Sequence, residues 1–301
     1  MSFLSKVTTG KIKKPRMVLI YGPDGCGKST FGAQAPSPIF LGSEEGTNNL
    51  DVARFPPVSK WSDIMASLNE LSSEKHEYKT LVIDSLDWIE PLLYQHICDR
   101  YGVKSIELAA GGYGKGFSES LNEWIGFNKL LSKLRDEKKM NVILIAHAEI
   151  TKFSDPNAQV EYDRFSLKLY KKSSSLFREF VDCVLFANFE VVAKKDGTKT
   201  RAYGDGVRVM YTERRPGFDA KNRFGLPFSL PLSWHDFDKA CDEDKSNSLP
   251  FLKTSINELA SQLDEELKKK VIETMEKAGD NIPQLEAIRN RVLIILGEKG
   301  E

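Results

Sequence analysis

Cysteine and histidine are scarce in this chain of 301 residues, which holds four of each. The cysteines stand far apart and form no C-x-x-C pair, so a disulfide scaffold and a zinc knuckle are excluded and reduced thiols are predicted. The histidines are equally dispersed, and no histidine-rich metal site is visible. The residues concerned are Cys26, Cys98, Cys183, Cys241, His76, His96, His147 and His235.

Net charge is lacking as well, because 43 lysines and arginines balance 43 aspartates and glutamates. No overall field therefore points to a polyanionic partner, and any nucleic-acid argument rests on local patches. No stretch approaches the length of a membrane span, and the N-terminus has no signal-peptide core. We therefore predict a soluble, cytoplasmic protein without a membrane partner.

Strand and helix signals alternate along most of the chain. Short apolar runs predict buried strands, and apolar residues at helical spacing between them predict helices. This alternation is typical of an α/β fold with a mostly parallel twisted sheet flanked by helices. The Asp196-Gly197 pair predicts a hairpin turn. The strands are expected at 17–21, 38–41, 80–83 and 141–146, the last ending in His147.

Composition divides the chain into three parts. Residues 1–16 carry five basic side chains and no acid, which indicates a basic leader. Residues 17–245 hold the α/β core. From residue 249 two apolar stripes at helical spacing predict a small helical module that extends to residue 301.

What the sequence does contain is a complete phosphate-binding loop. The pattern G-x-x-x-x-G-K-S follows the apolar run Met17–Tyr21 directly. In a strand–loop–helix the backbone N–H groups cradle phosphate, Lys28 reaches the β- and γ-phosphates and Ser29 ligates Mg²⁺. A glycine-rich turn that binds nothing is the alternative, but lysine, hydroxyl and upstream strand are all present. We predict a site for a nucleoside triphosphate and Mg²⁺ and take the nucleotide to be ATP, although the sequence does not distinguish ATP from GTP. It is formed by Gly22, Pro23, Asp24, Gly25, Cys26, Gly27, Lys28, Ser29 and Thr30.

Three further polar residues follow predicted strands. Asp84 ends the strand at 80–83, where it can hold Mg²⁺ or cap the next helix. Glu44 follows the second strand and is the candidate that orients the attacking water, with Glu45 as its competitor. His147 is placed to sense the γ-phosphate, or else it is a packing residue.

Two segments combine aromatic rings with cations, as binders of single-stranded nucleic acid do. The first is a glycine-rich segment, 111–117, expected to be a mobile loop. The second spans 152–172, where several acids dilute the charge. A mobile surface loop with core aromatics is the alternative. The candidate contacts are Tyr113, Lys115, Phe117, Lys152, Arg164, Lys168, Lys171 and Lys172.

Over residues 15–230 this layout resembles the RecA-like recombinase ATPases. The pentapeptide Lys221-Asn222-Arg223-Phe224-Gly225 is similar to the lysine–asparagine–arginine signature of the bacterial RadA recombination proteins, with a close relative in DnaB-type helicases. The overall pattern, including the Ile145-Ala146-His147 strand end, most resembles the phage-encoded annealing ATPases of the Sak type.

The resemblance implies that Lys221 and Arg223 reach the γ-phosphate of a neighbouring subunit and that Glu44 is the water-orienting base. Without the resemblance, the residues themselves indicate only that Lys221 and Arg223 belong to a basic turn. It also implies a homo-oligomer, ring or filament, that assembles on single-stranded DNA and promotes annealing or strand exchange. The setting is the cytoplasm of a bacterial host, and a single-strand-binding protein is a candidate partner. The alternatives are a ring-forming translocase or helicase-like motor, and a non-hydrolytic nucleotide-gated loader or mediator.

Overall fold

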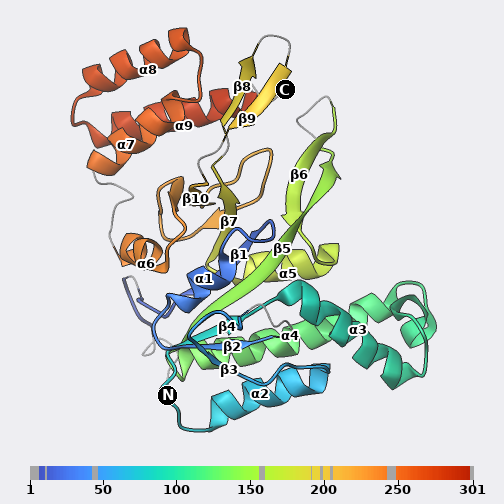
Figure 1. Ribbon diagram of the computed structural model, residues 1–301. Coiled ribbons are helices and arrows are strands. Elements are labelled where there is room, and N and C mark those ends of the chain that lie inside the picture. Colours follow the sequence, from blue (N-terminus) through green and yellow to red (C-terminus); the bar gives the residue numbers. More distant parts are fainter. Residues whose placement is uncertain are drawn as a thin grey trace.

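The computed structural model describes residues 7–10, 12–42, 47–155, 160–190, 192–196, 199–203, 206–242 and 249–298. A mixed sheet lies at its centre, with helices on both faces and a separate group of helices near the C-terminus (Figure 1).

The phosphate-loop strand occupies the middle of this sheet. β1 (Met17–Gly22) is parallel to β5 (Asn141–Phe153) on one side and to β7 (Cys183–Phe189) on the other. Three parallel strands follow beyond β5, in the order β4 (Thr80–Ile83), β2 (Pro38–Leu41) and β3 (Ala53–Arg54). Antiparallel strands complete the other side: β10 (Arg208–Tyr211), β12 (Ser229–Pro231) and β11 (Lys221–Asn222).

The predicted fold class is therefore confirmed. β5 lies between the strand that leads into the phosphate loop and the strand that leads into Asp84. The carboxyl ends of β1, β4 and β5 consequently meet at one edge of the sheet, where ligands of open α/β sheets bind.

The sheet is covered on both faces because alternate residues of each strand point to opposite sides. Met17, Leu19 and Tyr21 of β1 belong to the larger core, and Val18 and Ile20 belong to the core on the other face. The larger core is covered by α2 (Trp61–Ser73), α3 (Leu86–Tyr101), α4 (Lys115–Asp136) and α5 (Lys171–Phe180). The opposite core is covered by α1 (Lys28–Ala33) and α6 (Trp234–Asp242).

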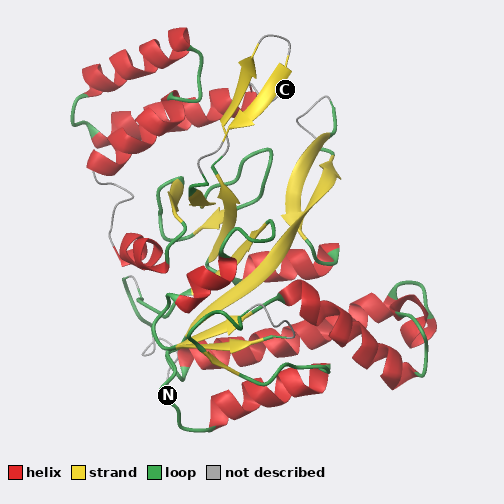
Figure 2. Ribbon diagram, viewed as in Figure 1, coloured by secondary structure: helices red, strands yellow, loops and turns green. Residues whose placement is uncertain are grey.

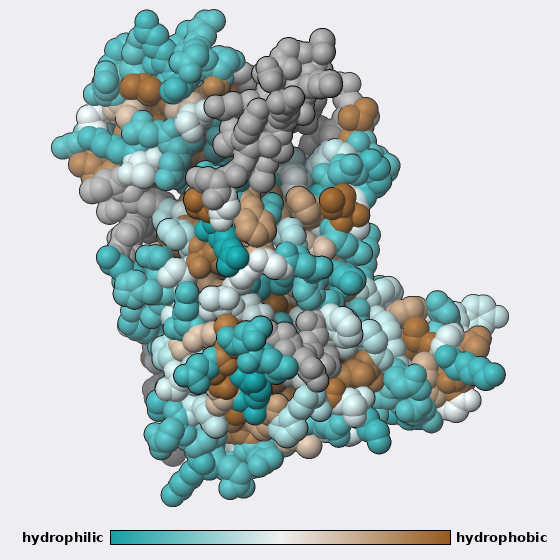
Figure 3. Space-filling view, in the orientation of Figure 1, coloured by the Kyte–Doolittle hydropathy of each residue, from teal (hydrophilic) through white to brown (hydrophobic). Residues whose placement is uncertain are grey.

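The C-terminal helices have a small core of their own. Leu252, Ile256 and Leu285 are almost fully buried among them, and the surface visible in Figure 3 is largely hydrophilic. An ion pair between Arg289 and Glu213 joins the module to the sheet domain. The helices are α7 (Leu249–Ala260), α8 (Glu265–Ala278) and α9 (Ile282–Glu298). Among the described residues, no helix combines the length and apolar character that a membrane crossing requires.

The hairpin predicted near Asp196 consists of β8 (Val192–Asp196) and β9 (Lys199–Tyr203), which pair antiparallel. Gly197 of its predicted turn lies outside the described residues.

Two sequence expectations are corrected by the fold. β5 does not end at His147 but continues to Phe153, where it pairs with β6 (Tyr162–Leu167) as a ribbon that extends beyond the sheet (Figure 2). The glycine-rich segment is also shorter than expected. A 3-10 helix, η2 (Ile106–Gly111), precedes it, and α4 begins at Lys115, so Lys115 and Phe117 lie in the first turn of that helix.

Candidate nucleotide site and nucleic-acid cleft

The phosphate loop folds tightly because glycine stands where no side chain fits. A Cβ on Gly22 would lie 2.0 Å from the carbonyl oxygen of Ala187 in the neighbouring strand. Gly27 has a φ of 103°, a left-handed conformation that other residues rarely adopt, and it directly precedes α1. The strand–loop–helix required for phosphate binding is therefore present.

Lys28 turns back over the loop. Its Nζ donates to the carbonyl oxygens of Gly22 at 3.0 Å and Pro23 at 2.8 Å, and the residue is 5% exposed. A buried ammonium held by two neutral carbonyls has no counter-ion among these contacts. A phosphate oxygen is a stronger partner for it than either carbonyl, because charge-assisted bonds are the stronger ones.

The two predicted Mg²⁺ ligands are in contact. Ser29 Oγ donates to Asp84 Oδ2 at 2.6 Å. Burial raises the pKa of Asp84, against the hydrogen bond from Ser29 and the charge of Lys28. A hydroxyl and a carboxylate are the oxygen donors that Mg²⁺ takes in nucleotide sites, so these residues fit the ion. Helix capping, the alternative role of Asp84, is not observed: α3 has Ser85 as its N-cap, and no side chain caps it.

Space for a ligand lies next to Asp84. A hollow of about 330 Å³ is lined by Asp84 together with Gly42, Thr47 and Arg54. Glu44 and Glu45 lie outside the described residues, so the position of neither candidate base is given. Gly42, two residues before Glu44, packs against the backbone of Asp84, where an added Cβ would lie 1.8 Å from the carbonyl oxygen.

His147 lies beside the loop, in register with Gly22 on the neighbouring strand. Its Nδ1 is 2.8 Å from Asp87 Oδ2, and its Nε2 is 3.3 Å from Asp24 Oδ1. The hydrogen bond to Asp87 raises the pKa of His147, against the effect of burial. Burial alone would raise the pKa of Asp87, but the bonds from His147 leave it lowered. His147 is thus an anchored residue facing the phosphate loop.

The anchor, Asp87, was not predicted from the sequence. It lies in the first turn of α3, three residues after Asp84, and its side chain is 3% exposed. The only sequence signal for Asp87 was a second acid three residues after the aspartate that ends a strand. Nothing near it in the sequence shows that its partner is His147, sixty residues further along the chain.

The His147–Asp87 pair predicts a pH-dependent stability. The pKa of His147 is raised above 6.5 in the folded state, so its contribution is fully present below that value and is lost as pH rises through the folded pKa. The pKa of Asp87 is lowered in the folded state, so the stability that its carboxylate contributes is present at higher pH and is lost as pH falls through the folded pKa. We expect the melting temperature to fall more on His147→Gln at about pH 6 than at about pH 9. Calorimetry of both proteins at the two pH values measures this, and an equal fall at both would contradict it.

The two predicted fingers differ in their surroundings. Lys221 Nζ donates to three carbonyl oxygens at the end of α5, those of Arg178 at 2.8 Å, Glu179 at 3.0 Å and Val181 at 2.6 Å. Burial lowers the pKa of Lys221. Arg223 is more open: its side chain is 56% exposed and lies 3.5 Å from Asp182. Lys221 therefore caps its own chain in this conformation, whereas Arg223 is accessible.

The two predicted nucleic-acid segments lie next to each other. The ring of Phe117, at the start of α4, stacks on Tyr170 at the start of α5, with centroids 4.6 Å apart. Tyr113 is fully exposed, and Lys115 is exposed beside it. Phe117 is therefore engaged in packing, whereas Tyr113 and Lys115 are available at the surface.

The second segment borders a cleft of about 590 Å³ between the β5–β6 ribbon and α5. Lys152 and Lys171 line it, although Lys152 is paired with Asp163 at 2.8 Å. Lys168 and Lys172 belong to the same segment and are exposed. Part of the segment's positive charge thus lines one concave surface.

Arg164 is the exception among the predicted contacts. It is 5% exposed, its guanidinium covers the ring of Phe153 at 4.5 Å, and Asp219 lies 3.4 Å away. Burial lowers the pKa of Arg164. Arg164 nevertheless lines the same cleft, so a phosphate contact by this residue stays a prediction that its burial makes less accessible than the others.

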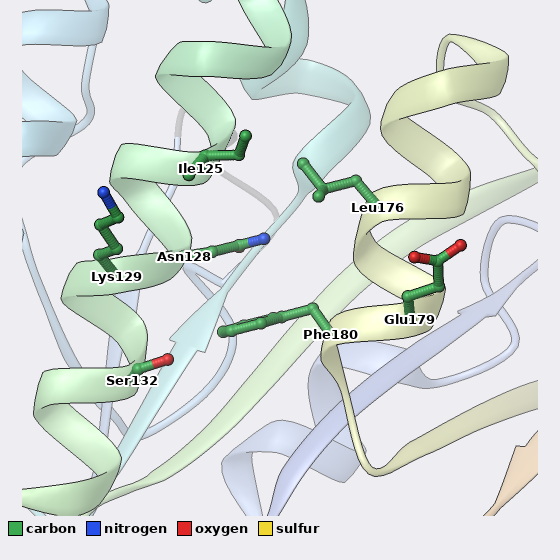
Figure 4. Close-up of a pocket in the computed structure, with 7 residues that line it drawn as sticks. All are labelled: Ile125, Asn128, Lys129, Ser132, Leu176, Glu179 and Phe180. Atoms are coloured by element: carbon green, nitrogen blue, oxygen red, sulfur yellow. The ribbon is translucent and has the colours of Figure 1, made fainter.

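A further hollow, of about 510 Å³, lies between α4 and α5 (Figure 4). Ile125, Leu176 and Phe180 give it an apolar wall, and Asn128 Oδ1 is buried there with no hydrogen-bond partner among the described residues. It contains none of the predicted site residues.

Comparisons with known proteins bear on this site. A family model described as "AAA domain" matches residues 14–224. The chain is 26% identical over 151 residues to the SPbeta prophage-derived uncharacterized protein YorG of Bacillus subtilis, which covers 49% of this chain and 44% of that protein. The chain thus spans less than half the length of this relative. A structural match, at a TM-score of 0.39 and 15% identity, is the crystal structure of the RadB recombinase, covering 67% of this chain and 82% of that one.

Proposed function

Because the chain belongs to the AAA domain family, whose model matches its phosphate loop and most of its sheet domain, we propose that it is an ATPase that assembles on single-stranded DNA and promotes annealing or strand exchange. The observation that carries the ATPase part is the contact of Ser29 with Asp84 beside a buried Lys28. These three groups are those that a phosphate-loop enzyme uses to hold Mg²⁺ and a triphosphate.

Within this proposal each group has a distinct task. Loop N–H groups and Lys28 bind the phosphates, and Ser29 with Asp84 holds Mg²⁺, which neutralises charge that develops on the phosphates. Glu44 orients the attacking water. His147 contacts the terminal phosphate. Arg223 supplies positive charge to the site of a neighbouring subunit, and Lys221 can join it only by giving up its three bonds to α5.

Binding of single-stranded DNA is proposed for the surface formed by Tyr113, Lys115 and the cleft beside α5. Exposed lysines there can neutralise phosphates, and an exposed tyrosine can stack on a base without reading sequence. Glu149 and Glu161 also line the cleft, so we expect modest affinity. The prophage origin in the name of the relative supports a phage setting, in the cytoplasm of a bacterial host, for the proposed role in recombination.

The experiment that tests this function is ATP turnover with and without single-stranded DNA, with electron microscopy of the assemblies formed. We expect DNA to raise turnover several-fold, and its affinity to fall linearly with salt on logarithmic scales, because each neutralised phosphate releases counterions. A Lys168→Ala/Lys171→Ala/Lys172→Ala variant should flatten that slope, and Lys129→Ala, on the surface of α4, is the matched control.

The other outcomes are informative. Turnover without DNA stimulation, or DNA binding insensitive to salt, would contradict the DNA part and leave an ATPase. Negligible turnover with DNA present would favour a nucleotide-gated loader, and directional strand separation would favour a translocating ring.

A further inference from the structure

The position of His147 is set by Asp87 through two hydrogen bonds. The backbone N–H of His147 donates to Asp87 Oδ1 at 3.0 Å, and its Nδ1 lies 2.8 Å from Oδ2. Asp87 is anchored in turn, since it lies in the first turn of α3 and its side chain is nearly inaccessible. A carboxylate that holds both the main chain and the ring of one histidine fixes where the other ring nitrogen points.

The free side of the ring faces the phosphate loop. His147 Nε2 lies 3.3 Å from Asp24 Oδ1, on a loop residue whose side chain is 92% exposed. Both ring nitrogens therefore lie close to carboxylate oxygens, Nδ1 within hydrogen-bonding distance of Asp87 and Nε2 within ion-pair distance of Asp24. Because an ionised carboxylate only accepts hydrogen bonds, this arrangement favours the imidazolium, which carries a proton on each nitrogen. The exposed carboxylate of Asp24 is the weaker of the two contacts, and an anion of higher charge can displace it.

We propose that Asp87 is a positioning residue, which holds His147 as an imidazolium so that its Nε2–H binds the terminal phosphate of a triphosphate in place of Asp24. This rests on the proposed ATPase function and adds to it a means of distinguishing ATP from ADP. Lys28, which also faces this region, binds a diphosphate as well as a triphosphate. His147 binds only a phosphate that ADP lacks.

The test compares affinities for ATPγS and ADP, each with Mg²⁺, in the full-length chain. Asp87→Asn keeps the size of the side chain and an acceptor for the backbone N–H, but removes the charge that sustains the imidazolium. We expect ATPγS affinity to fall about tenfold, the effect of losing one charge-assisted hydrogen bond, with ADP affinity changed less than about twofold. Asp99→Asn, in the last turn of the same helix, is the matched control.

A double-mutant cycle separates positioning from a merely structural role. In a His147→Ala background, Asp87→Asn should cost no further ATPγS affinity, because the group that it positions is gone. Additive losses, or equal losses for ADP and ATPγS, would overturn the proposal.

A measurement on the unaltered protein keeps the proposal testable if Asp87→Asn does not fold. The chain has four histidines, so ¹⁵N-histidine spectra are simple, and His147→Ala assigns the signal. We expect imidazolium shifts for His147 at about pH 7, with an Nε2 signal that moves on addition of ATPγS but not of ADP. A neutral ring, or an identical response to both nucleotides, would overturn it. A wild-type chain that binds neither nucleotide would refute the proposed function itself.

Discussion

Replacing Lys28 by alanine is expected to lower ATP affinity by about 100-fold or more. Hydrogen bonds to charged groups contribute roughly 1.5–3 kcal/mol each, and this ammonium serves two phosphates, so a loss of about 3 kcal/mol is a lower bound. The side chain lies on the loop already, where its Nζ can exchange the carbonyls of Gly22 and Pro23 for charged phosphate oxygens, which are stronger partners. Calorimetric titration with ATPγS and Mg²⁺ measures the effect.

The control concerns the loop itself. Lys28 is buried, so its removal can disturb the loop as well as the ligand contact. Lys28→Arg keeps the charge but not the compact ammonium, and the melting temperatures of both variants show whether the sheet domain is intact. A Lys28→Ala protein that melts normally and binds ATPγS with wild-type affinity would exclude this loop as the nucleotide site.

The nucleotide site could be predicted where its parts are contiguous in sequence. The phosphate loop is one segment whose spacing reflects its mechanism, and Asp84 follows a short buried strand of the kind that apolar runs reveal. Asp84 meets the phosphate loop at Ser29 because parallel strands bring their carboxyl ends to one edge of the sheet. Asp87 could not be predicted in this way, because its role depends on a contact between the start of α3 and the neighbouring strand β5.

The surface proposed for nucleic acid was harder to predict, since it depends on which cations are exposed. Arg164 and Lys168 stand in the same basic, aromatic segment, yet Arg164 is buried with its guanidinium against the ring of Phe153, whereas Lys168 is exposed. The difference arises because β5 continues as a ribbon with β6 and turns Arg164 toward Asp219. In that continuation charged and polar residues stand between the apolar ones, so no apolar run like that of 141–146 indicated a strand.

Arg223→Ala is expected to leave ATP affinity within about threefold of wild type and to lower kcat by about 100-fold or more. Cations supplied in trans to phosphoryl transfer contribute on the order of 10³–10⁵ to kcat in related sites, because they act on charge that develops in the transition state. Arg223 makes one described ion pair, at 3.5 Å to Asp182, so its removal disturbs its own chain little. Steady-state turnover and ATPγS titration separate the two effects, with the exposed Arg214→Ala as matched control.

Mixing the two inactive proteins tests where that charge acts. A Lys28→Ala subunit retains Arg223, and an Arg223→Ala subunit retains the phosphate loop, so a shared site would regain part of the wild-type turnover when they assemble together. Lys221→Ala is a poorer probe, because losing three bonds to the end of α5 should lower the melting temperature as well as turnover. Turnover that stays at the level of the separate variants in a mixed assembly would place every catalytic cation within one chain, and hydrolysis would then need no neighbour.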